Sequence, residues 1–226
     1  MPPDSSAPAR RVVTRSPAKT VRRLNMPGLF GAAVECESSL ERDFVLRAAL
    51  CPSVRTIRHQ PFRLQLAPKR TYVPDFLVVT GSGRGVVVEV KLSTHVEKFR
   101  ERFDQAREEL AQRDVDFMVV TELSIHAGRG HERAARVLRY RKAGIDEAVA
   151  GRITAVLEQH PAGFSLAALC ASCHVQVTDV LTLAAARRVR LSRSIDLDPS
   201  ALVYPIFSSG VDDEIRLTSW FDVPLW

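Results

Sequence analysis

The sequence has 226 residues, with 32 lysines and arginines against 26 aspartates and glutamates, for a formal net charge of +6. This length accommodates one full domain and a small second one, and a chain of this size should bury about 70% of the surface that its unfolded form exposes. No stretch approaches the roughly 20 apolar residues of a membrane span, so we expect no association with a membrane.

Most of the positive excess lies in the first 26 residues, which are rich in proline and serine and carry a single acid, Asp4. Composition of this kind favours a segment without a fold of its own. Such an arm could follow the backbone of DNA by neutralising phosphates, or it could be a solubilising tail. It lacks the apolar run of a secretory signal. The candidate DNA-binding bases are Arg10, Arg11, Arg15, Lys19, Arg22 and Arg23.

A helix is predicted from Ser38 to about residue 50, and Pro52 stops it. Glu41 follows Ser38 by three residues, which is the spacing of a capping box at a helix N-terminus. The alternative is that Glu41 directs a third carboxylate at a metal site, and one residue could serve both purposes. Glu37, directly before the cap, is the weaker candidate for this third acid.

Two strands are predicted next, over residues 71–79 and 85–91, and the Gly-Ser-Gly turn between them favours an antiparallel hairpin. Side chains alternate between the faces of a strand, so Glu89 and Lys91 share one face. In a hairpin, Asp75 can lie beside Glu89. The pattern P-D-x13-E-x-K therefore gathers two carboxylates and an ammonium group at the edge of a sheet.

Two carboxylates and an ammonium group are the side chains that metal-dependent hydrolysis of phosphodiesters uses. Mg²⁺ takes oxygen ligands and keeps several waters, and Asp75, Glu89 and the backbone carbonyl of Val90 could hold it against a phosphate. The metal would acidify a bound water and offset charge on the phosphoryl oxygens, while Lys91 could orient that water or stabilise the transition state. For E-x-K alone, a solvated Glu–Lys pair on an exposed strand is the better interpretation. The preceding Pro-Asp and the acid at Glu41 favour the site.

The following segment predicts a crossover unit. Residues 95–113 have the apolar stripe of a long helix, and residues 115–121 form a buried strand, so this strand should return parallel to the strand at 85–91. Charges of both signs are interleaved on the exposed side of the helix. They favour a solvated face over a phosphate-binding one.

The composition changes after Gly128-Arg129-Gly130. The predicted elements beyond it are helices at 131–142, 146–158, 165–173 and 176–188, then strands at 189–191 and 202–206. Three short helices followed by two strands suggest a winged-helix module with 176–188 as its recognition helix and Thr178, Asp179 and Thr182 facing outward. Contact with DNA and docking on protein both stay open for this helix. Docking is slightly favoured, because the basic residues lie only at its end.

The four cysteines are expected to be reduced thiols. Cys170-Ala-Ser-Cys173-His174 matches a haem-attachment string and also offers three zinc ligands, but it falls in a helical segment rich in alanine and leucine, so small buried cysteines are the favoured interpretation. The last twenty residues combine acids with Trp220, Phe221 and Trp226. This tail could anchor a basic partner or the domain itself, or form a disordered end.

Several of these segments together resemble a known family. The matching stretches are Ser38–Glu41, Val54–Phe62, Tyr72–Val78 and Glu89–Lys91, and they are similar to the N-terminal catalytic domain of TnsA-type endonucleases, the subunits of heteromeric transposases that cut the 5′ ends of the element. The resemblance runs from about residue 37 to 125. It puts the family's helix acid on Glu41, its strand aspartate on Asp75, and its x-Val-Lys motif on Glu89, Val90 and Lys91. Some members carry glutamine at the position of Glu89.

The resemblance implies an α/β fold, a restriction-endonuclease-like mixed sheet flanked by helices, of the PD-(D/E)xK superfamily. The implied cofactor is Mg²⁺, with Mn²⁺ able to replace it, held by Asp75, Glu89 and the Val90 carbonyl, with Glu41 for a second metal. The implied partners are double-stranded DNA at transposon ends, a DDE-type transposase subunit and an AAA+ ATPase regulator. The expected location is the bacterial cytoplasm, in association with the nucleoid.

We therefore expect a basic arm (1–26), a nuclease domain (27–130), a mostly helical, winged-helix-like C-terminal domain (131–207) and an acidic, aromatic tail (208–226). The predicted function is Mg²⁺-dependent cleavage of the 5′ ends of a transposon during cut-and-paste DNA transposition. Two alternatives remain. One is a stand-alone nuclease of the same superfamily, of phage, repair or restriction type, and the other is a non-catalytic DNA-binding scaffold subunit.

Overall fold

The computed structural model describes residues 22–67, 70–192, 198–206 and 216–226. Its centre is a four-stranded sheet in the order β3-β6-β7-β8, built from β3 (Val54–His59), β6 (Phe76–Thr80), β7 (Gly85–Lys91) and β8 (Val115–Thr121). β6 is antiparallel to both β3 and β7, and β8 lies parallel to β7. The predicted hairpin and the predicted crossover are therefore both present.

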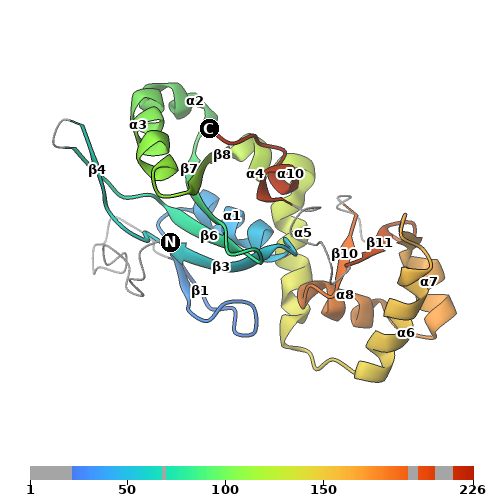
Figure 1. Cartoon of the computed structure of the whole chain (residues 1–226). Helices are drawn as coiled ribbons and strands as arrows, with labels where there is room; N and C mark the ends of the chain where they lie inside the picture. The colour runs from blue at the N-terminus through green and yellow to red at the C-terminus, as the bar shows by residue number, and fades with distance from the viewer. Residues whose placement is uncertain (1–21, 68–69, 193–197, 207–215) are drawn as a thin grey trace.

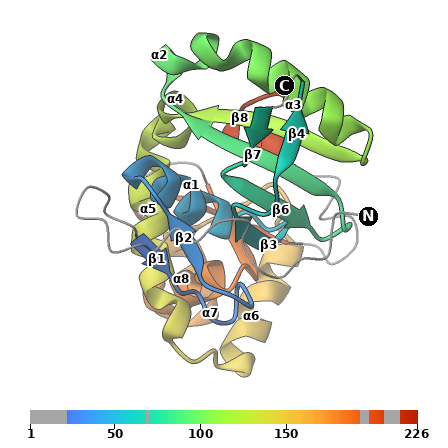
Figure 2. The same ribbon diagram turned by 90° about the vertical axis from the view of Figure 1, so that its left-hand side faces the viewer.

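Helices cover both faces of this sheet (Figures 1 and 2). α1 (Ser39–Ala49) packs on one face through an apolar stripe that includes Phe44, and α3 (Arg100–Ala111) packs on the other through residues such as Phe103. Every residue of β7 except Lys91 is buried, as expected for a central strand with both faces covered. The mixed sheet flanked by helices is the restriction-endonuclease-like architecture that the sequence predicts.

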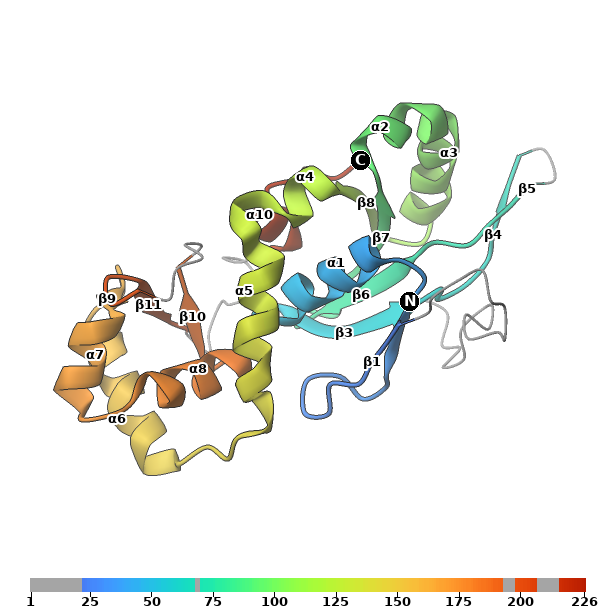
Figure 3. The same cartoon turned by 180° about the vertical axis from the view of Figure 1, so that it is seen from behind.

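Among the predicted elements that differ in extent from the structure, one strand and one helix of the nuclease part are interrupted. The strand predicted over 71–79 is broken at Val73-Pro74-Asp75, because proline has no N–H to give to the ladder. β5 (Arg70–Tyr72) instead pairs with β4 (Leu64–Leu66) in a separate ribbon that extends beyond the sheet (Figure 3). The helix predicted over 95–113 consists of α2 (Ser93–Val96), a 3-10 turn η1 (Glu97–Phe99) and α3.

Short elements surround the sheet. β1 (Arg22–Leu24) and β2 (Val34–Cys36) form an antiparallel pair before α1. After β8 come α4 (Glu122–Ile125), a 3-10 turn η2 (Ala127–Arg129), and α5 (Gly130–Val137), which a 3-10 turn η3 (Leu138–Lys142) extends. α5 and η3 run between the sheet and the C-terminal unit (Figure 3). α10 (Leu217–Phe221) returns to the nuclease part of the chain.

The C-terminal unit has its own apolar cluster. It comprises the helices α6 (Glu147–Glu158), α7 (Leu166–Cys173) and α8 (Val177–Ala185), and a sheet in the order β10-β11-β9, from β9 (Phe164–Ser165), β10 (Val189–Leu191) and β11 (Leu202–Pro205). The three helices and two of the strands are those predicted. β9 is too short to leave an alternating pattern in the sequence. The winged-helix assignment stays a prediction.

α8 faces outward as predicted only in its first turn, where Thr178 is exposed and Asp179 is partly exposed. Residues 180–185 are all buried, and the helix packs against η3 and α5. Thr182, expected to face outward, is buried, and its hydroxyl donates to the carbonyl of Thr178 at 2.8 Å. The prediction for Thr182 is wrong because α8 is covered on one side by its own unit and on another by the connecting helix.

Within the ranges that the structure describes, no single helix is long and apolar enough to cross a membrane. α7 and α8 taken together reach the length and composition required, but the two helices meet at 109°. Their apolar residues belong to the cluster of the C-terminal unit.

Candidate active site

The first feature of the site is a gap in the ladder between β6 and β7. Their pairing ends at Phe76 and Val88, whereas β7 stays paired with β8 as far as Lys91. Asp75 lies at this end of β6, and its Oδ2 accepts a hydrogen bond of 2.8 Å from the N–H of Val90. The side chain of Asp75 therefore occupies the place where the next backbone partner of β7 would lie.

The backbone of Asp75 is also anchored to β3. Its carbonyl accepts a hydrogen bond of 2.8 Å from the N–H of Gln60, the residue directly after β3. Gln60 has a φ of 41°, in the left-handed region that residues other than glycine enter at a cost. Gln60 Nε2 donates to Glu37 Oε1 at 3.0 Å, so the same residue links Asp75 to the segment that leads into α1.

Glu89 is held at both of its carboxylate oxygens. Glu89 is 3% exposed, and its Oε1 lies 2.8 Å from Lys91 Nζ. Oε2 accepts a hydrogen bond of 2.5 Å from the hydroxyl of Tyr72, which is buried at the end of β5. Tyr72 lies within the segments that carry the family resemblance, but the sequence by itself indicates no role for it. The sequence feature that could have indicated this role is the position of Tyr72, three residues before Asp75 and on a strand that packs beside the Glu89 face.

Lys91 lies at the exposed end of β7. Besides its ion pair with Glu89, the ammonium group lies 5.3 Å from the centre of the Phe99 ring, a distance at which cation–π attraction operates. Lys91 retains partial solvent access, with 28% of its side chain exposed. The ammonium group is therefore positioned by two contacts and can still meet a substrate.

Glu41 reaches the site from α1 on the other face of the sheet. Ser38 caps the helix by accepting from the N–H of Glu41 at 3.1 Å, and the Glu41 carboxylate accepts from the Glu37 N–H at 2.7 Å and the Ser38 hydroxyl at 3.0 Å. The predicted capping interaction is confirmed. The same carboxylate interacts electrostatically with Asp75 and Lys91. Glu41 can therefore cap α1 and still act together with the other charged groups of the site.

The charges of the site act on one another strongly. Burial, together with the carboxylates of Glu89 and Glu41, raises the pKa of Asp75 well above its ordinary value. Burial also raises the pKa of Glu41. For Lys91, burial by itself would lower the pKa, but the neighbouring carboxylates, Glu89 first, outweigh it and raise the pKa. An excess of negative charge is thus concentrated at the end of β7.

The donor set fits a hard divalent cation. Three carboxylates repel one another here, and a cation would relieve that repulsion. The N–H and C=O groups of one strand residue point toward the same neighbour, so the carbonyl of Val90 faces the side on which its N–H meets Asp75. Lys91 and Tyr72 hold the Glu89 oxygens, and the three acids are not among the ligand groups whose atoms lie within 4.8 Å of one another in the described part of the chain. Metal binding would draw these oxygens together.

The chain is similar to a known protein family. The model for the N-terminal domain of TnsA-like endonucleases matches residues 51–122, about a third of the chain. The chain carries a TnsA-like endonuclease domain. Comparison with curated proteins gives no match.

The TnsA-like match includes three of the four predicted site residues, Asp75, Glu89 and Lys91. Glu41 lies ten residues before the match begins, so its assignment rests on the resemblance of Ser38–Glu41 and on its electrostatic contact with the other acids. The match ends one residue into α4. The C-terminal unit lies beyond it.

The basic residues predicted to bind DNA are described only in part. Arg10, Arg11, Arg15 and Lys19 lie outside the described residues. Arg22 and Arg23 begin β1, which pairs with β2 so that Arg22 lies opposite Cys36, directly before Glu37. The visible end of the arm therefore lies next to the N-terminus of α1, which carries Glu41.

The side chains of the cysteine string do not converge on one point in the described part of the chain. Cys173 is buried, and its thiol donates to the carbonyl of Arg152 at 3.6 Å. Cys170 is partly buried in the same helix, and His174 ends α7 with a φ of 53°. Within the described residues these three are not among the groups with converging ligand atoms, which agrees with the favoured interpretation of small packed cysteines.

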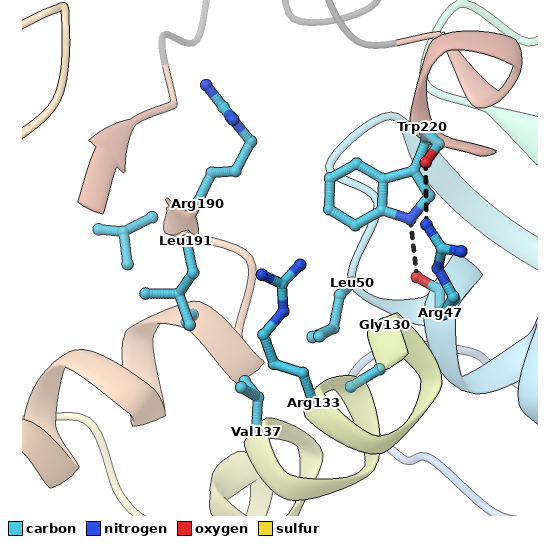
Figure 4. A pocket seen from close by; sticks show the side chains of 11 residues that line it. Arg47, Leu50, Gly130, Arg133, Val137, Arg190, Leu191 and Trp220 are labelled. Atoms are coloured by element: carbon cyan, nitrogen blue, oxygen red, sulfur yellow. Dashed lines mark hydrogen bonds between the residues drawn. The ribbon is translucent and has the colours of Figure 1, made fainter. Parts of the chain in front are cut away.

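A separate small cavity lies between α1, α5, β10 and α10, away from the acids (Figure 4). Its lining includes Arg47, Arg133, Arg190 and Trp220, and its volume is about 30 Å³, room for a single water. Arg47 and Trp220 are joined by two hydrogen bonds, from Trp220 Nε1 to the Arg47 carbonyl at 3.0 Å and from Arg47 to the Trp220 carbonyl at 3.2 Å. Arg47 links α1 to α4 and α10, and Arg133 links α5 to Ser192 directly after β10.

Proposed function

We propose that this protein is a Mg²⁺-dependent DNA endonuclease that cuts the 5′ ends of a transposon during cut-and-paste transposition. The observation that carries the proposal is the meeting of Asp75, Glu89 and Lys91 where β6 leaves β7, within the TnsA-like match, with Glu41 near enough to act on Asp75 electrostatically. The site is built on strands and a capped helix. Rigid elements of this kind hold catalytic groups more accurately than loops do.

Each residue would have a distinct role. Asp75, one oxygen of Glu89 and the Val90 carbonyl would hold Mg²⁺, and Glu41 would contribute to a second metal or to the water. The chemistry that Mg²⁺ supplies when bound is activation of a water and neutralisation of charge on the phosphoryl oxygens. Lys91, held by Glu89 and Phe99, would orient the water or stabilise the developing negative charge.

The proposed partners follow from the TnsA-like domain. A DDE-type transposase subunit would cut and join the 3′ ends, and an AAA+ ATPase would control the choice of target. Cutting of both strands by the two enzymes turns copying of the element into excision. The basic arm would contact DNA through its phosphates, with Arg22 and Arg23 nearest to α1.

Strand-specific cleavage tests this proposal. Labelled transposon-end DNA and Mg²⁺ are mixed with the wild type or with Asp75→Ala, each with and without the cognate transposase. We expect 5′ cleavage that needs Mg²⁺, Asp75 and the partner. The matched control is Asp116→Ala, which removes a partly exposed carboxylate paired with Arg84 at the opposite end of the sheet and should cost at most about 1 kcal/mol of stability.

The other outcomes discriminate among the alternatives. Asp75-dependent cutting without a partner would indicate a stand-alone nuclease, and no cutting in any mixture would indicate a scaffold subunit. In cells, Asp75→Ala should convert simple insertions into cointegrates, because 3′ joining would proceed without 5′ cleavage. Simple insertions at the wild-type frequency would refute the proposal.

A further inference from the structure

A second group of ligand-type side chains lies on the far side of α1 from Glu41. Residues two positions apart on a helix point about 200° apart around its axis, so Asp43 faces α4 and α5 instead of the acid site. There it meets His126, at the end of α4, and His131, in the first turn of α5. One ligand atom from each of these three residues lies within 4.8 Å of those of the other two.

The contacts of Asp43 leave one oxygen directed at the histidines. Its side chain is 7% exposed. Oδ1 accepts from Arg42, at 2.9 Å from Nε and 2.5 Å from a terminal nitrogen, while Oδ2 lies 3.1 Å from His126 Nε2. Arg42 therefore compensates one side of a buried carboxylate and fixes its orientation. Oδ2 remains the oxygen available as a ligand.

The second histidine is not accounted for by hydrogen bonding. The two imidazole rings lie side by side, with centroids 4.1 Å apart. The Nδ1 of His131 is buried and has no hydrogen-bond partner among the described residues, and its Nε2 lies 4.0 Å from Glu132 Oε1. Buried polar atoms are almost always paired, so an unpaired ring nitrogen on a histidine of this group points to a bound ligand.

We propose that Asp43, His126 and His131 form a binding site for a transition-metal ion of the Zn²⁺ class, separate from the acid site. Two imidazoles and one carboxylate form a three-residue protein ligand set for Zn²⁺, with water in the remaining position. Imidazole nitrogens favour such borderline ions over Mg²⁺, which prefers oxygen. The metal would join α1, which carries Glu41, to α4 and α5, which lead to the C-terminal unit.

Metal titration of the full-length, untagged chain tests this site. Asp75→Ala serves as the background, so that the acid site does not contribute, and Zn²⁺ binding is followed by calorimetry and Co²⁺ binding by visible absorption. We expect about one equivalent of Zn²⁺ and the absorption bands of low-coordinate Co²⁺. His126→Ala should weaken Zn²⁺ binding by at least about tenfold, since even outer-shell partners of a metal site contribute that much.

Two variants make the result decisive. His126 is 42% exposed, so His126→Ala should fold normally, and His131→Ala should produce the same loss from the other side of the site. His95→Ala removes an exposed histidine of α2 and should leave binding unchanged. Absence of saturable Zn²⁺ binding in the background protein would overturn the proposal, as would full retention of the metal in the His126→Ala variant, which would place it elsewhere, for example at Cys170 and Cys173.

Discussion

At the scale of single residues, the least expected finding is that Glu89 is held by Tyr72 as well as by Lys91. The phenol donates to Oε2 while the ammonium group occupies Oε1. Burial and the adjacent Glu89 carboxylate raise the pKa of Tyr72 well above its ordinary value, so the phenol keeps its proton at every working pH. Tyr72 is thus a positioning residue for a carboxylate that would bind metal.

Tyr72→Phe should keep the fold and slow cleavage. The variant loses one hydrogen bond to a charged group, worth about 1.5–3 kcal/mol, so we expect cleavage to fall by roughly 10- to 100-fold, with a higher Mg²⁺ concentration needed for half-maximal rate. The measurement is the initial rate of 5′ cleavage across a Mg²⁺ titration. Tyr140→Phe, a partly buried tyrosine of the C-terminal cluster, is the control. Equal rates for the two variants would mean that Tyr72 does not position Glu89.

The pH dependence of stability should reveal Asp75. Its pKa is raised in the folded protein, so the folded state prefers the protonated acid, and the stability gained from that proton is lost as the pH rises from the ordinary Asp range through the raised pKa. In chelator, the free energy of unfolding should therefore decline across this window. Asp75→Asn should flatten that decline and raise the free energy of unfolding of the metal-free protein at neutral pH, because the amide has no charge to bury.

Urea unfolding in chelator at several pH values measures this effect. Asp116→Asn, the same change on a partly exposed carboxylate of β8, should follow the wild-type curve. Added Mg²⁺ should make the wild type more stable than Asp75→Asn at neutral pH, because the ion stabilises the form with an ionised Asp75. If the free energy of unfolding of the wild type varies with pH as little as that of Asp75→Asn, the pKa of Asp75 is not raised in the folded protein.

At the scale of elements, the aromatic C-terminal segment is part of the nuclease core. Phe221 of α10 is 1% exposed and stacks on Phe44 of α1 at 5.1 Å, with the Arg47 guanidinium 4.8 Å from its ring centre. Trp226 donates to Asp104 of α3 at 2.8 Å and packs edge-on against Phe103. Of the roles open from sequence, anchoring the domain itself is the one observed for residues 216–226. Residues 208–215 lie outside the described part of the chain.

Phe221→Ala should destabilise the nuclease part strongly. Removal of a buried phenylalanine costs about 3–5 kcal/mol through lost burial and the cavity that remains. Leu225→Ala is the control in the same segment, because Leu225 is 45% exposed and its loss should change stability by no more than about 0.5 kcal/mol. The midpoint of urea unfolding measures both. If Phe221→Ala and Leu225→Ala both have the same urea midpoint as the wild type, α10 does not contribute to the core in solution.

At the scale of the whole molecule, the positive charge is concentrated at one end of the sequence. The arm carries six bases against one acid, and its described end, β1, lies beside the segment that leads into α1. An arm that starts there could run along the same DNA whose phosphate enters the acid site. Binding by such an arm is electrostatic and should weaken with salt.

Deletion of residues 1–21 should lower the salt dependence of DNA binding. The deletion removes Arg10, Arg11, Arg15 and Lys19 and keeps β1, so the slope of log K against log salt concentration should become shallower by up to about 3–4, at roughly 0.9 for each phosphate that these bases neutralise. Fluorescence anisotropy with duplex DNA at several salt concentrations measures the slope. Neutral substitution of the same four bases in the full-length chain is the control for chain length. An unchanged slope would identify the arm as a solubilising tail.

Much of the acid site could be predicted from the sequence because its signals are local. Strand alternation puts Glu89 and Lys91 on one face, the turn at residues 81–83 sets the hairpin that brings Asp75 across from them, and the Ser38–Glu41 spacing predicts the cap. The burial of Thr182 could not be predicted, because it depends on how α8 packs against elements earlier in the chain, whereas Thr178 is exposed as predicted. The role of Tyr72 was hidden for a related reason, since Pro74 separates its strand from β6.

Short-range periodicity and turn chemistry are enough to specify the order of the main elements, the mixed sheet and the three charged groups where β6 leaves β7. Which distant segments meet is seen only in the folded protein. The tertiary structure brought α10 back onto Phe44, set His131 beside His126 and Asp43, and aligned the phenol of Tyr72 with Glu89. Contacts of this kind depend on how helices and strands pack in three dimensions, and the local periodicity of the sequence does not specify that packing.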